Sequence, residues 1–286
     1  MLDPLPDAKL AWLQLARCEG VGPVTFAALL ERHGSAPAAL RAVRREPAPD
    51  GGGPRRVPDR AALEAELATL AALGGRVVTG AEPDYPPPLR PLPDAPPALS
   101  VRGDAGLLHR PAVAVVGARN ASGNGCGFAR SLARELARAG VVVVSGLARG
   151  IDTAAHEGAL AGDGATVAVI AAGVDVAYPP ENADLMARIA ASGAVVSERS
   201  LGATARAKDF PRRNRVIAGL ALGVVVVEAA PASGSLITAR LAVEYGREVM
   251  AVPGSPQDPR HRGTNQLLRD GAHLVESARD VLAILE

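Results

Sequence analysis

Five cations stand within ten residues of the chain, in the segment Arg206–Arg215 (RAKDFPRRNR), together with one acid and a Phe-Pro pair. The whole chain carries a formal net charge of only +1, so these cations are a local concentration. The segment includes Lys208, one of two lysines in the sequence. A guanidinium is a planar, bidentate donor that keeps its charge, which suits phosphate. The segment therefore predicts an anion site, with phosphate as the first candidate.

Two other stretches have the composition of an anion-binding turn. Arg119 follows a β-branched run and precedes Ser122 and several glycines. Ser233-Gly234-Ser235 precedes a stretch of helical periodicity, and we expect it to form the N-terminus of a helix, where amides, hydroxyls and the helix dipole attract anions. We expect both turns to converge with the basic segment above one sheet. This combination favours phosphate binding over a merely solvated charged surface.

The sheet that must position these residues is indicated by apolar runs that alternate with stretches of helical periodicity. Continuous β-branched runs of this kind are typical of an α/β fold, in which a mostly parallel sheet is covered by helices on both faces. Ligands of such sheets bind beyond the carboxyl ends of the strands, where this chain has small residues and Arg119. The runs are Ala112–Val116, Val141–Val144, Thr166–Ile170, Ala194–Val196, Val224–Val227 and Val249–Val252.

The first 80 residues have a different character. Residues 8–45 have helical periodicity on both sides of the turn Gly20–Pro23, which suits either a helix-hairpin-helix that meets a DNA backbone or a plain helix–helix turn. Residues 46–58 are rich in Pro and Gly and indicate a mobile loop, followed by a helix at 59–74 and a strand near 76–79. We predict a small helical domain over residues 1–80 and a sheet domain over residues 81–286, with the proline-rich stretch 85–99 extended over the latter.

Familiar cofactor and catalytic motifs are missing from the sequence. The segment GARNASGNGCG after the first run does not match the dinucleotide-binding motif GxGxxG. The second run is followed by Ser145-Gly146, where a dinucleotide site has an acidic residue for the ribose. The phosphate-loop motif GxxxxGK[ST] is also missing from the sequence. Ser145 also lacks the flanking glycines of a nucleophile elbow. Asp152 and His156 stand four residues apart without a further ligand, so a polar contact is favoured over a metal site. We expect no cofactor, no metal and no catalytic residue.

Cysteine usage and hydropathy limit the class of protein. Cys18 and Cys126 fall in separate predicted domains and support neither a disulfide framework nor a CxxC motif. No apolar run approaches the roughly 20 residues of a membrane span, and the N-terminus has no signal-peptide pattern. Aromatic residues make up only 2% of the chain, which argues against many stacking platforms for bases. We expect a cytoplasmic protein without a membrane partner.

An ordered series of motifs resembles the bacterial DNA-processing protein A family, also called DprA or Smf. The series extends from about residue 85 to about residue 275, and the turn at Gly20–Pro23 is similar to the small helical domain of that family. The motifs are G-x-R-x-x-S-x-x-G (Gly117, Arg119, Ser122, Gly125), Ser145–Asp152, Ala172–Pro179 with Asn182, Ser197-Glu198, Phe210–Arg215, Glu228-Ala229, Ser233–Ala239, Gly246–Val249 and Val252–Gly254.

The resemblance implies an extended Rossmann-like domain that binds single-stranded DNA and has no established enzymatic activity. Proteins of this family help to load the recombinase RecA onto incoming strands in natural transformation, and they act as dimers. Arg119 and Lys208 would hold phosphates, and Phe210 and Asn214 would lie beside the strand, while Arg215 is expected to be structural. The full set of DNA contacts implied in this way is Gly117, Arg119, Ser122, Ser145, Gly146, Lys208, Phe210, Arg212, Arg213, Asn214, Gly234 and Ser235.

The chain departs from the family pattern at two places. Asn124 stands where an aromatic residue is usual. The winged-helix-like C-terminal domain of many members is expected to be absent from this sequence, which ends at Glu286, either because the protein lacks that domain or because the sequence is a piece of a longer chain. Apolar residues near this end would either form an interface or, as we favour, close the core: Leu267, Leu268, Val281, Leu282, Ile284 and Leu285.

The alternative function is enzymatic. Nucleoside-monophosphate phosphoribohydrolases have a similar Rossmann-like sheet and a glycine-rich turn, PGGxGTxxE, before a helix. Pro231–Thr238 superficially resembles this turn, and Glu244 would then be the acid. The spacing does not match, so single-stranded DNA binding is preferred.

Overall fold

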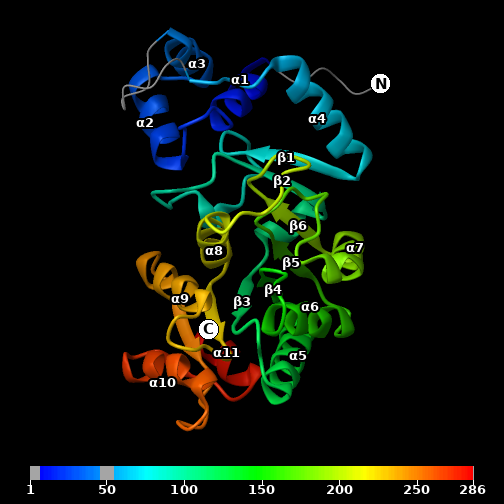
Figure 1. Cartoon of the computed structure of the whole chain (residues 1–286), viewed down its shortest axis with the longest axis vertical. Coiled ribbons are helices and arrows are strands. Elements are labelled where there is room, and N and C mark those ends of the chain that lie inside the picture. The colour runs from blue at the N-terminus through cyan, green and yellow to red at the C-terminus, as the bar shows by residue number, and fades with distance from the viewer. Residues whose placement is uncertain (1–6, 46–54, 286) are drawn as a thin grey trace.

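The computed structural model describes residues 7–45 and 55–285, which form a small helical unit and a larger unit built on one sheet (Figure 1). Residues 46–54 of the predicted loop lie outside the described residues. Within the described residues, no helix is both long and apolar enough to cross a membrane.

The sheet has nine strands in the described part of the chain, in the order β1-β2-β6-β5-β4-β3-β7-β8-β9. All neighbours from β6 to β9 in this order are parallel, and β2 is antiparallel to both of its neighbours. The six predicted apolar runs correspond to β3–β8, so this prediction is confirmed. The strands are β1 (Gly75–Thr79), β2 (Ala98–Gly103), β3 (Ala112–Val116), β4 (Val142–Ser145), β5 (Thr166–Val169), β6 (Ala194–Ser197), β7 (Gly223–Val226), β8 (Glu248–Ala251) and β9 (His273–Leu274).

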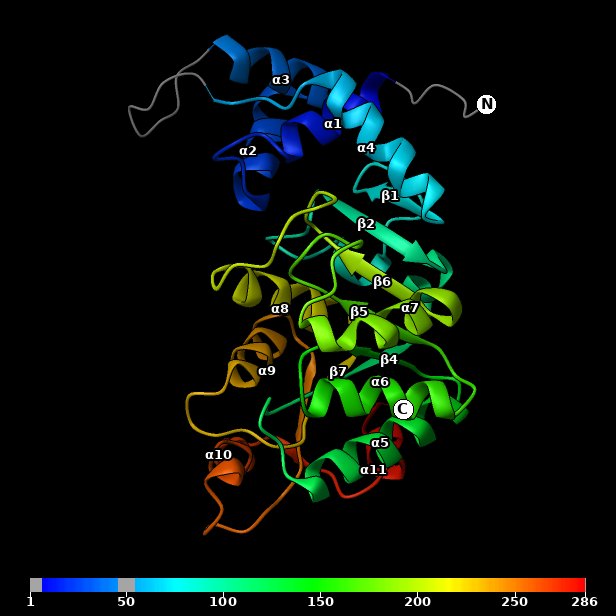
Figure 2. The ribbon, with the colours of Figure 1, turned by 45° about the vertical axis from the view of Figure 1, so that its right-hand side comes forward.

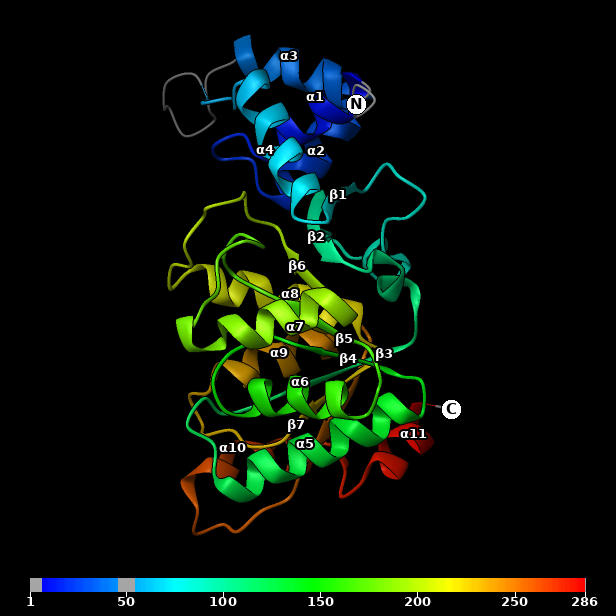
Figure 3. The same ribbon diagram turned by 90° about the vertical axis from the view of Figure 1, so that its right-hand side faces the viewer.

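Helices cover both faces of this sheet, as the alternating pattern predicts (Figures 2 and 3). Because side chains alternate along a strand, Val113 and Val115 of β3 pack with α5 and α6, whereas Ala114 and Val116 pack with α8. The helices of the first face are α5 (Gly123–Arg138), α6 (Ile151–Ala161) and α7 (Ala183–Ser192), and those of the second are α8 (Asp209–Leu220) and α9 (Gly234–Glu244).

The centre of the sheet holds a topological switch point. β3 lies between β4, which follows it in sequence, and β7, which comes more than a hundred residues later. Connections from the two halves of such a sheet leave in opposite directions and open a crevice at the carboxyl ends of the central strands. In this chain that crevice lies after Val116, where Arg119 was predicted to bind an anion.

β1 belongs to the sheet, although the predicted small domain extends to residue 80. Its residues pair with β2 from Gly75 opposite Arg102 to Thr79 opposite Ala98. The predicted strand near 76–79 is therefore confirmed, but β2 was not predicted. The boundary drawn after residue 80 falls between two hydrogen-bonded strands, and the sheet already begins at Gly75.

The N-terminal helices confirm the helical prediction for residues 8–45. Gly20, at φ +74°, lies in the turn before α2, a conformation that a side chain would strain, and Pro23 begins that helix. The Trp12 and Phe26 rings pack with centroids 4.8 Å apart, and Trp12 Nε1 donates a 2.7 Å hydrogen bond to the Pro97 carbonyl, which ties this unit to the sheet unit. The helices are α1 (Asp7–Ala16), α2 (Pro23–His33), α3 (Ala36–Arg45) and α4 (Arg60–Ala72).

The proline-rich stretch 85–99 corrects a prediction. It is not simply extended, because it contains a 3₁₀ helix (Pro87–Leu89) and buries Leu89 and Leu92 in the core on the α8 face. The Tyr85 hydroxyl donates to the Pro96 carbonyl at 2.7 Å. The fixed φ of proline fits turns and 3₁₀ helices as well as extended chain, so composition alone did not separate them.

The C-terminal apolar residues close the core for the most part, as favoured. Val281 is fully buried, and Leu282, Ile284 and Leu285 pack against the core on the α5 face. Leu267 packs on the opposite face. These residues belong to α10 (Arg262–Arg269) and α11 (Ala278–Leu285).

Candidate nucleic-acid interface

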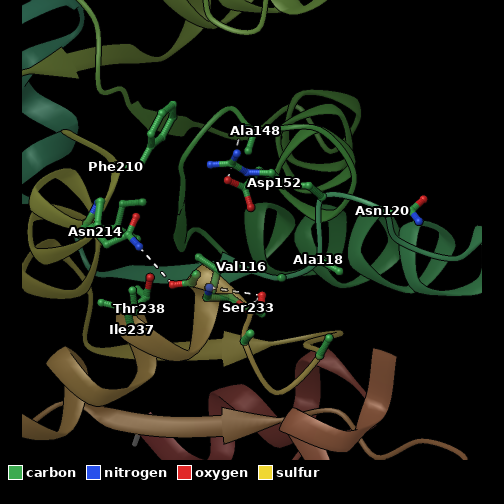
Figure 4. A pocket seen from close by; sticks show the side chains of 18 of the residues that line it. Val116, Ala118, Asn120, Ala148, Asp152, Phe210, Asn214, Ser233, Ile237 and Thr238 are labelled. Carbon is green, nitrogen blue, oxygen red and sulfur yellow. Dashed lines mark hydrogen bonds between the residues drawn. The ribbon is translucent and has the colours of Figure 1, made fainter. Parts of the chain in front are cut away.

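A pocket of about 620 Å³ opens at the carboxyl ends of β3 and β7, at the switch point of the sheet (Figure 4). Phe210 and Asn214 project into it from α8, Ala148 and Asp152 lie across from them, and Ser233 lies between the two sides. The predicted convergence of three segments therefore exists. Seven predicted contacts line the pocket, namely Gly117, Arg119, Phe210, Arg213, Asn214, Gly234 and Ser235.

The turn after β3 places Arg119 at the pocket because Gly117 lets the chain pass close to α6. A Cβ at Gly117 would lie 2.6 Å from Ile151 Cγ1, so a larger residue would push the turn outward. The exposed Arg119 guanidinium stands over the Phe210 ring, with Cζ 4.8 Å from the centroid. A cation over a ring face is stabilised by the ring quadrupole. The arrangement presents a positive charge and an aromatic surface at one point.

The N-terminus of α9 supplies the second anion-ready feature. Ser233 caps this helix, and its hydroxyl lies 2.8 Å from the Ser235 hydroxyl. Asn214 Nδ2 donates a 3.1 Å hydrogen bond to the Gly234 carbonyl and fixes the turn against α8 (Figure 4). Gly234 is exposed, and a Cβ there would meet nothing within 4 Å, so there is room for a ligand against the positive end of the helix.

Arg213 has a structural role that the sequence did not indicate. Although it lines the pocket, it is 7% exposed, and one terminal nitrogen donates to the carbonyls of Gly146 and Val169. Burial lowers the pKa of Arg213 to about 10, while nearby Asp152 opposes that shift, so the side chain keeps its charge at neutral pH. Its hydrogen bonds hold the ends of β4 and β5 together beneath the pocket.

Three predicted contacts have polar groups that are bonded within the protein. The Ser145 hydroxyl is fully buried and donates to the Val115 carbonyl at 2.7 Å. The Gly146 amide donates to Asp152 Oδ2 at 3.1 Å. Both the amide and the hydroxyl of Ser122 donate to the buried carboxylate of Glu228, so none of these groups is free to follow a DNA backbone.

Lys208 and Arg212 are exposed and lie outside the main pocket. Lys208 stands just before α8, and Arg212 borders a separate small hollow near Glu198. Neither has an ion pair within the described residues. They can therefore attract a polyanion to the rim without being held by the protein. Arg215, expected to be structural, is 8% exposed and ion-paired with Glu198.

Asp152 and His156 each have a polar contact, as favoured over a metal site. Asp152 accepts hydrogen bonds from two amides of the turn after β4, and burial raises its pKa. His156 Nδ1 lies 2.7 Å from the Thr166 hydroxyl, and burial lowers the pKa of His156 to about 3.

Two residues at the site were missed. Arg260 lines the pocket from the segment before α10, where its guanidinium pairs with Asp258 at 2.7 Å. Tyr178 lies beside Phe210, with ring centroids 5.5 Å apart. Tyr178 stands in the motif Ala172–Pro179, which was a signal for it, whereas nothing in the sequence points to Arg260.

Two protein-family models match the chain. The family model for DNA recombination-mediator protein A matches residues 76–286, and that for a DprA-like N-terminal HHH domain matches residues 6–69. The chain is 42% identical to protein Smf of Escherichia coli over 228 residues, which is 79% of this chain. It spans only 61% of the length of that protein and 53% of the length of protein Smf of Synechocystis.

Two solved structures have the same fold. DNA processing protein A from Streptococcus pneumoniae matches with a TM-score of 0.83 and 34% identity over 99% of both chains. DNA processing protein A from Helicobacter pylori, described as having a unique single-stranded DNA binding mode, matches with a TM-score of 0.67 and 31% identity over 74% of this chain and 95% of that chain. The Rossmann-like fold and the family resemblance are thus confirmed. The chain belongs to the DNA recombination-mediator protein A family.

Proposed function

We propose that this protein binds single-stranded DNA in the pocket at the ends of β3 and β7 and acts as a recombination mediator without turnover. The observation that carries the proposal is the position of Arg119, which stands over Phe210 and lines the same pocket as the N-terminus of α9. This pocket offers a cation, an aromatic face and a helix end for phosphate. A relative with the same fold, from Helicobacter pylori, is described as binding single-stranded DNA.

The lining of the pocket favours binding that tolerates any sequence. Its apolar side chains, such as Ile217, offer no donor or acceptor to base edges. Two of its polar side chains, Arg213 and Asn214, already donate hydrogen bonds to carbonyls of the protein. Affinity then comes from phosphates and stacking, as in other sequence-tolerant binders. Duplex DNA, whose bases are already stacked, would gain less from such a site.

The wider role follows from the family. We propose that the protein acts in the cytoplasm as a homodimer and helps to load RecA onto incoming single strands during natural transformation. The pocket would hold the strand while the recombinase assembles beside it.

The central experiment replaces both Arg119 and Lys208 with Ala and measures binding of single-stranded and duplex oligonucleotides of equal length over a range of salt. In the native protein we expect a steep salt dependence and preference for the single strand. Each lost phosphate contact should reduce the slope of log K against log salt by about 0.7. The double variant should therefore bind all sequences more weakly, with a shallower slope.

Arg138→Ala is the matched control. Arg138 is exposed at the far end of α5, roughly 20 Å along the helix from the turn that bears Arg119, and it should leave binding unchanged. Equal affinity of the double variant and the native protein at moderate salt would overturn the proposed site.

Glu244, the catalytic acid of the alternative enzymatic function, lies outside the pocket. Glu244 is exposed on α9, paired with Arg240 at 3.7 Å, and does not line the pocket, although the turn at Ser233–Ser235 does. Incubation with nucleoside monophosphates should release no free base. Release that is abolished by Glu244→Gln would favour a phosphoribohydrolase instead.

A further inference from the structure

A second, smaller hollow lies beside the main pocket. Its volume is about 90 Å³, and it shares Arg119, Ala148 and Phe210 with the main pocket. Arg119 and Phe210 therefore stand between the two hollows. The remaining residues that line the small one are Gly146, Arg149, Ala171, Tyr178, Pro179 and Pro180.

Tyr178 is exposed in a way that packing does not explain. The chain has only seven aromatic residues, and Tyr178 is the most exposed of them, at 45%. Within the described residues its hydroxyl has no hydrogen-bond partner. Its ring is tilted by 52° from the Phe210 ring at a centroid distance of 5.5 Å, which leaves ring surface open to solvent. A large aromatic side chain held in this way is suited to contact a ligand.

Cations stand on both sides of this aromatic pair. Arg119 lies over Phe210, and Arg149 borders the hollow next to Tyr178. The Arg149 side chain is 64% exposed, and its ion pair with Glu181 is a surface pair, which contributes little to stability. An aromatic platform between two guanidiniums matches the alternation of base and phosphate along a single strand.

We propose that the hollow at Tyr178 is a second nucleobase site, in which one base of the bound strand stacks on Tyr178 while Arg149 holds a neighbouring phosphate. The inference rests on the proposed function, because it assumes that a strand occupies the main pocket. The small volume suits one planar group and excludes a run of nucleotides. The DNA strand would thus pass over Arg119 and Phe210, which line both hollows, and place one base in each hollow.

The test compares Tyr178→Ala and Tyr178→Phe with the native protein on two ligands of equal length, an oligothymidylate and a fully abasic strand. Tyr178→Ala should bind the oligothymidylate on the order of tenfold more weakly, since stacking of one base is worth about 1–3 kcal/mol. Tyr178→Phe keeps the ring and should bind like the native protein. All three should bind the abasic strand equally, with an unchanged salt slope, because no phosphate contact is lost.

The outcomes separate this inference from the function on which it rests. If the native protein binds single strands with a steep salt dependence and Tyr178→Ala binds the oligothymidylate equally well, the second base site is wrong and the main pocket stands. The same loss on the abasic strand would also overturn it. If the native protein does not bind single strands, the proposed function itself fails.

A free nucleotide is the other source of a stacking base. Thymidine monophosphate, titrated without DNA, should bind only weakly to the native protein. Binding that depends on Tyr178, combined with unchanged oligothymidylate binding by Tyr178→Ala, would assign the hollow to a free nucleotide and overturn its assignment to the strand.

Discussion

The two sides of α8 carry cations of the same segment in opposite environments. Arg212 is exposed on the outer side, whereas Arg213, the next residue, is 7% exposed and bonded to two strand-end carbonyls. Successive residues of a helix point about 100° apart, so neighbours in one basic run take different roles. The local charge density therefore overstates the charge that is available to a ligand. Buried Arg213 holds the strand ends beneath the pocket, whereas exposed Lys208 and Arg212 can attract a polyanion.

The largest effect is expected from removing the buried cation, Arg213. Arg213→Ala would leave the Gly146 and Val169 carbonyls without their donor and would remove the buried cation near Asp152. A buried acceptor that loses its partner costs about 1–3 kcal/mol, and more where a charged group is involved. We expect a decrease of that size in the free energy of unfolding, measured by urea denaturation.

Arg212→Ala is the adjacent control and should change the same free energy by less than about 0.5 kcal/mol, as an exposed substitution. If Arg213→Ala were as stable as the native protein and only DNA binding were lost, Arg213 would be a ligand contact and the division of α8 into two sides would be wrong.

The pH dependence of stability tests a second buried residue below the pocket, His156. His156 is fully buried with a pKa of about 3, below its unfolded value near 6.5, because burial disfavours the charged ring. Between pH 6.5 and pH 3 His156 is protonated in the unfolded chain and neutral in the folded protein. Protonation therefore favours the unfolded chain, and the stability that neutral His156 allows at pH 7 is lost as the pH falls from about 6.5 towards 3. The slope is up to about 1.4 kcal/mol per pH unit.

In His156→Gln position 156 no longer titrates, so its free energy of unfolding should lack this pH dependence. The free energy of unfolding of the native protein, measured relative to that of His156→Gln, should therefore fall by about 2 kcal/mol from pH 7 to pH 5. Urea denaturation at both pH values measures it, and the comparison with the variant separates His156 from Asp152, whose raised pKa acts in the opposite sense. Parallel curves for the two proteins would show that His156 does not titrate on unfolding.

The sheet was predictable because its central strands are buried on both faces. The strand Val142–Ser145, for example, is buried at all four positions and begins with three valines, which continue the apolar run in the sequence. β2 has no such run, because Ala98–Gly103 is partly exposed, includes Ser100 and Arg102, and pairs antiparallel. The prediction therefore recovered the parallel centre and missed a strand at the antiparallel end.

The site was predictable at the level of segments and not of atoms. Glycines, serines and cations after strand ends indicate an anion site wherever the strands are parallel. A serine hydroxyl, however, satisfies a buried carboxylate as readily as a phosphate, and Ser122 does so with Glu228. Tyr178 lies in an irregular segment without periodicity, so no pattern gave its direction. Only packing decides such orientations.

The smallest expected effect belongs to Arg212 as a DNA contact. Arg212 borders the small hollow near Glu198 and lies outside the main pocket, so it should contribute through long-range attraction. Arg212→Ala should weaken single-strand binding only a few-fold at low salt and not at all at high salt, since exposed charges are screened beyond about 10 Å at 0.1 M ionic strength. Association rates from stopped-flow fluorescence should fall while dissociation rates stay constant, because a rim charge steers the encounter. A faster dissociation in this variant would mean that Arg212 touches the bound strand, and the outer side of α8 would then be part of the site itself.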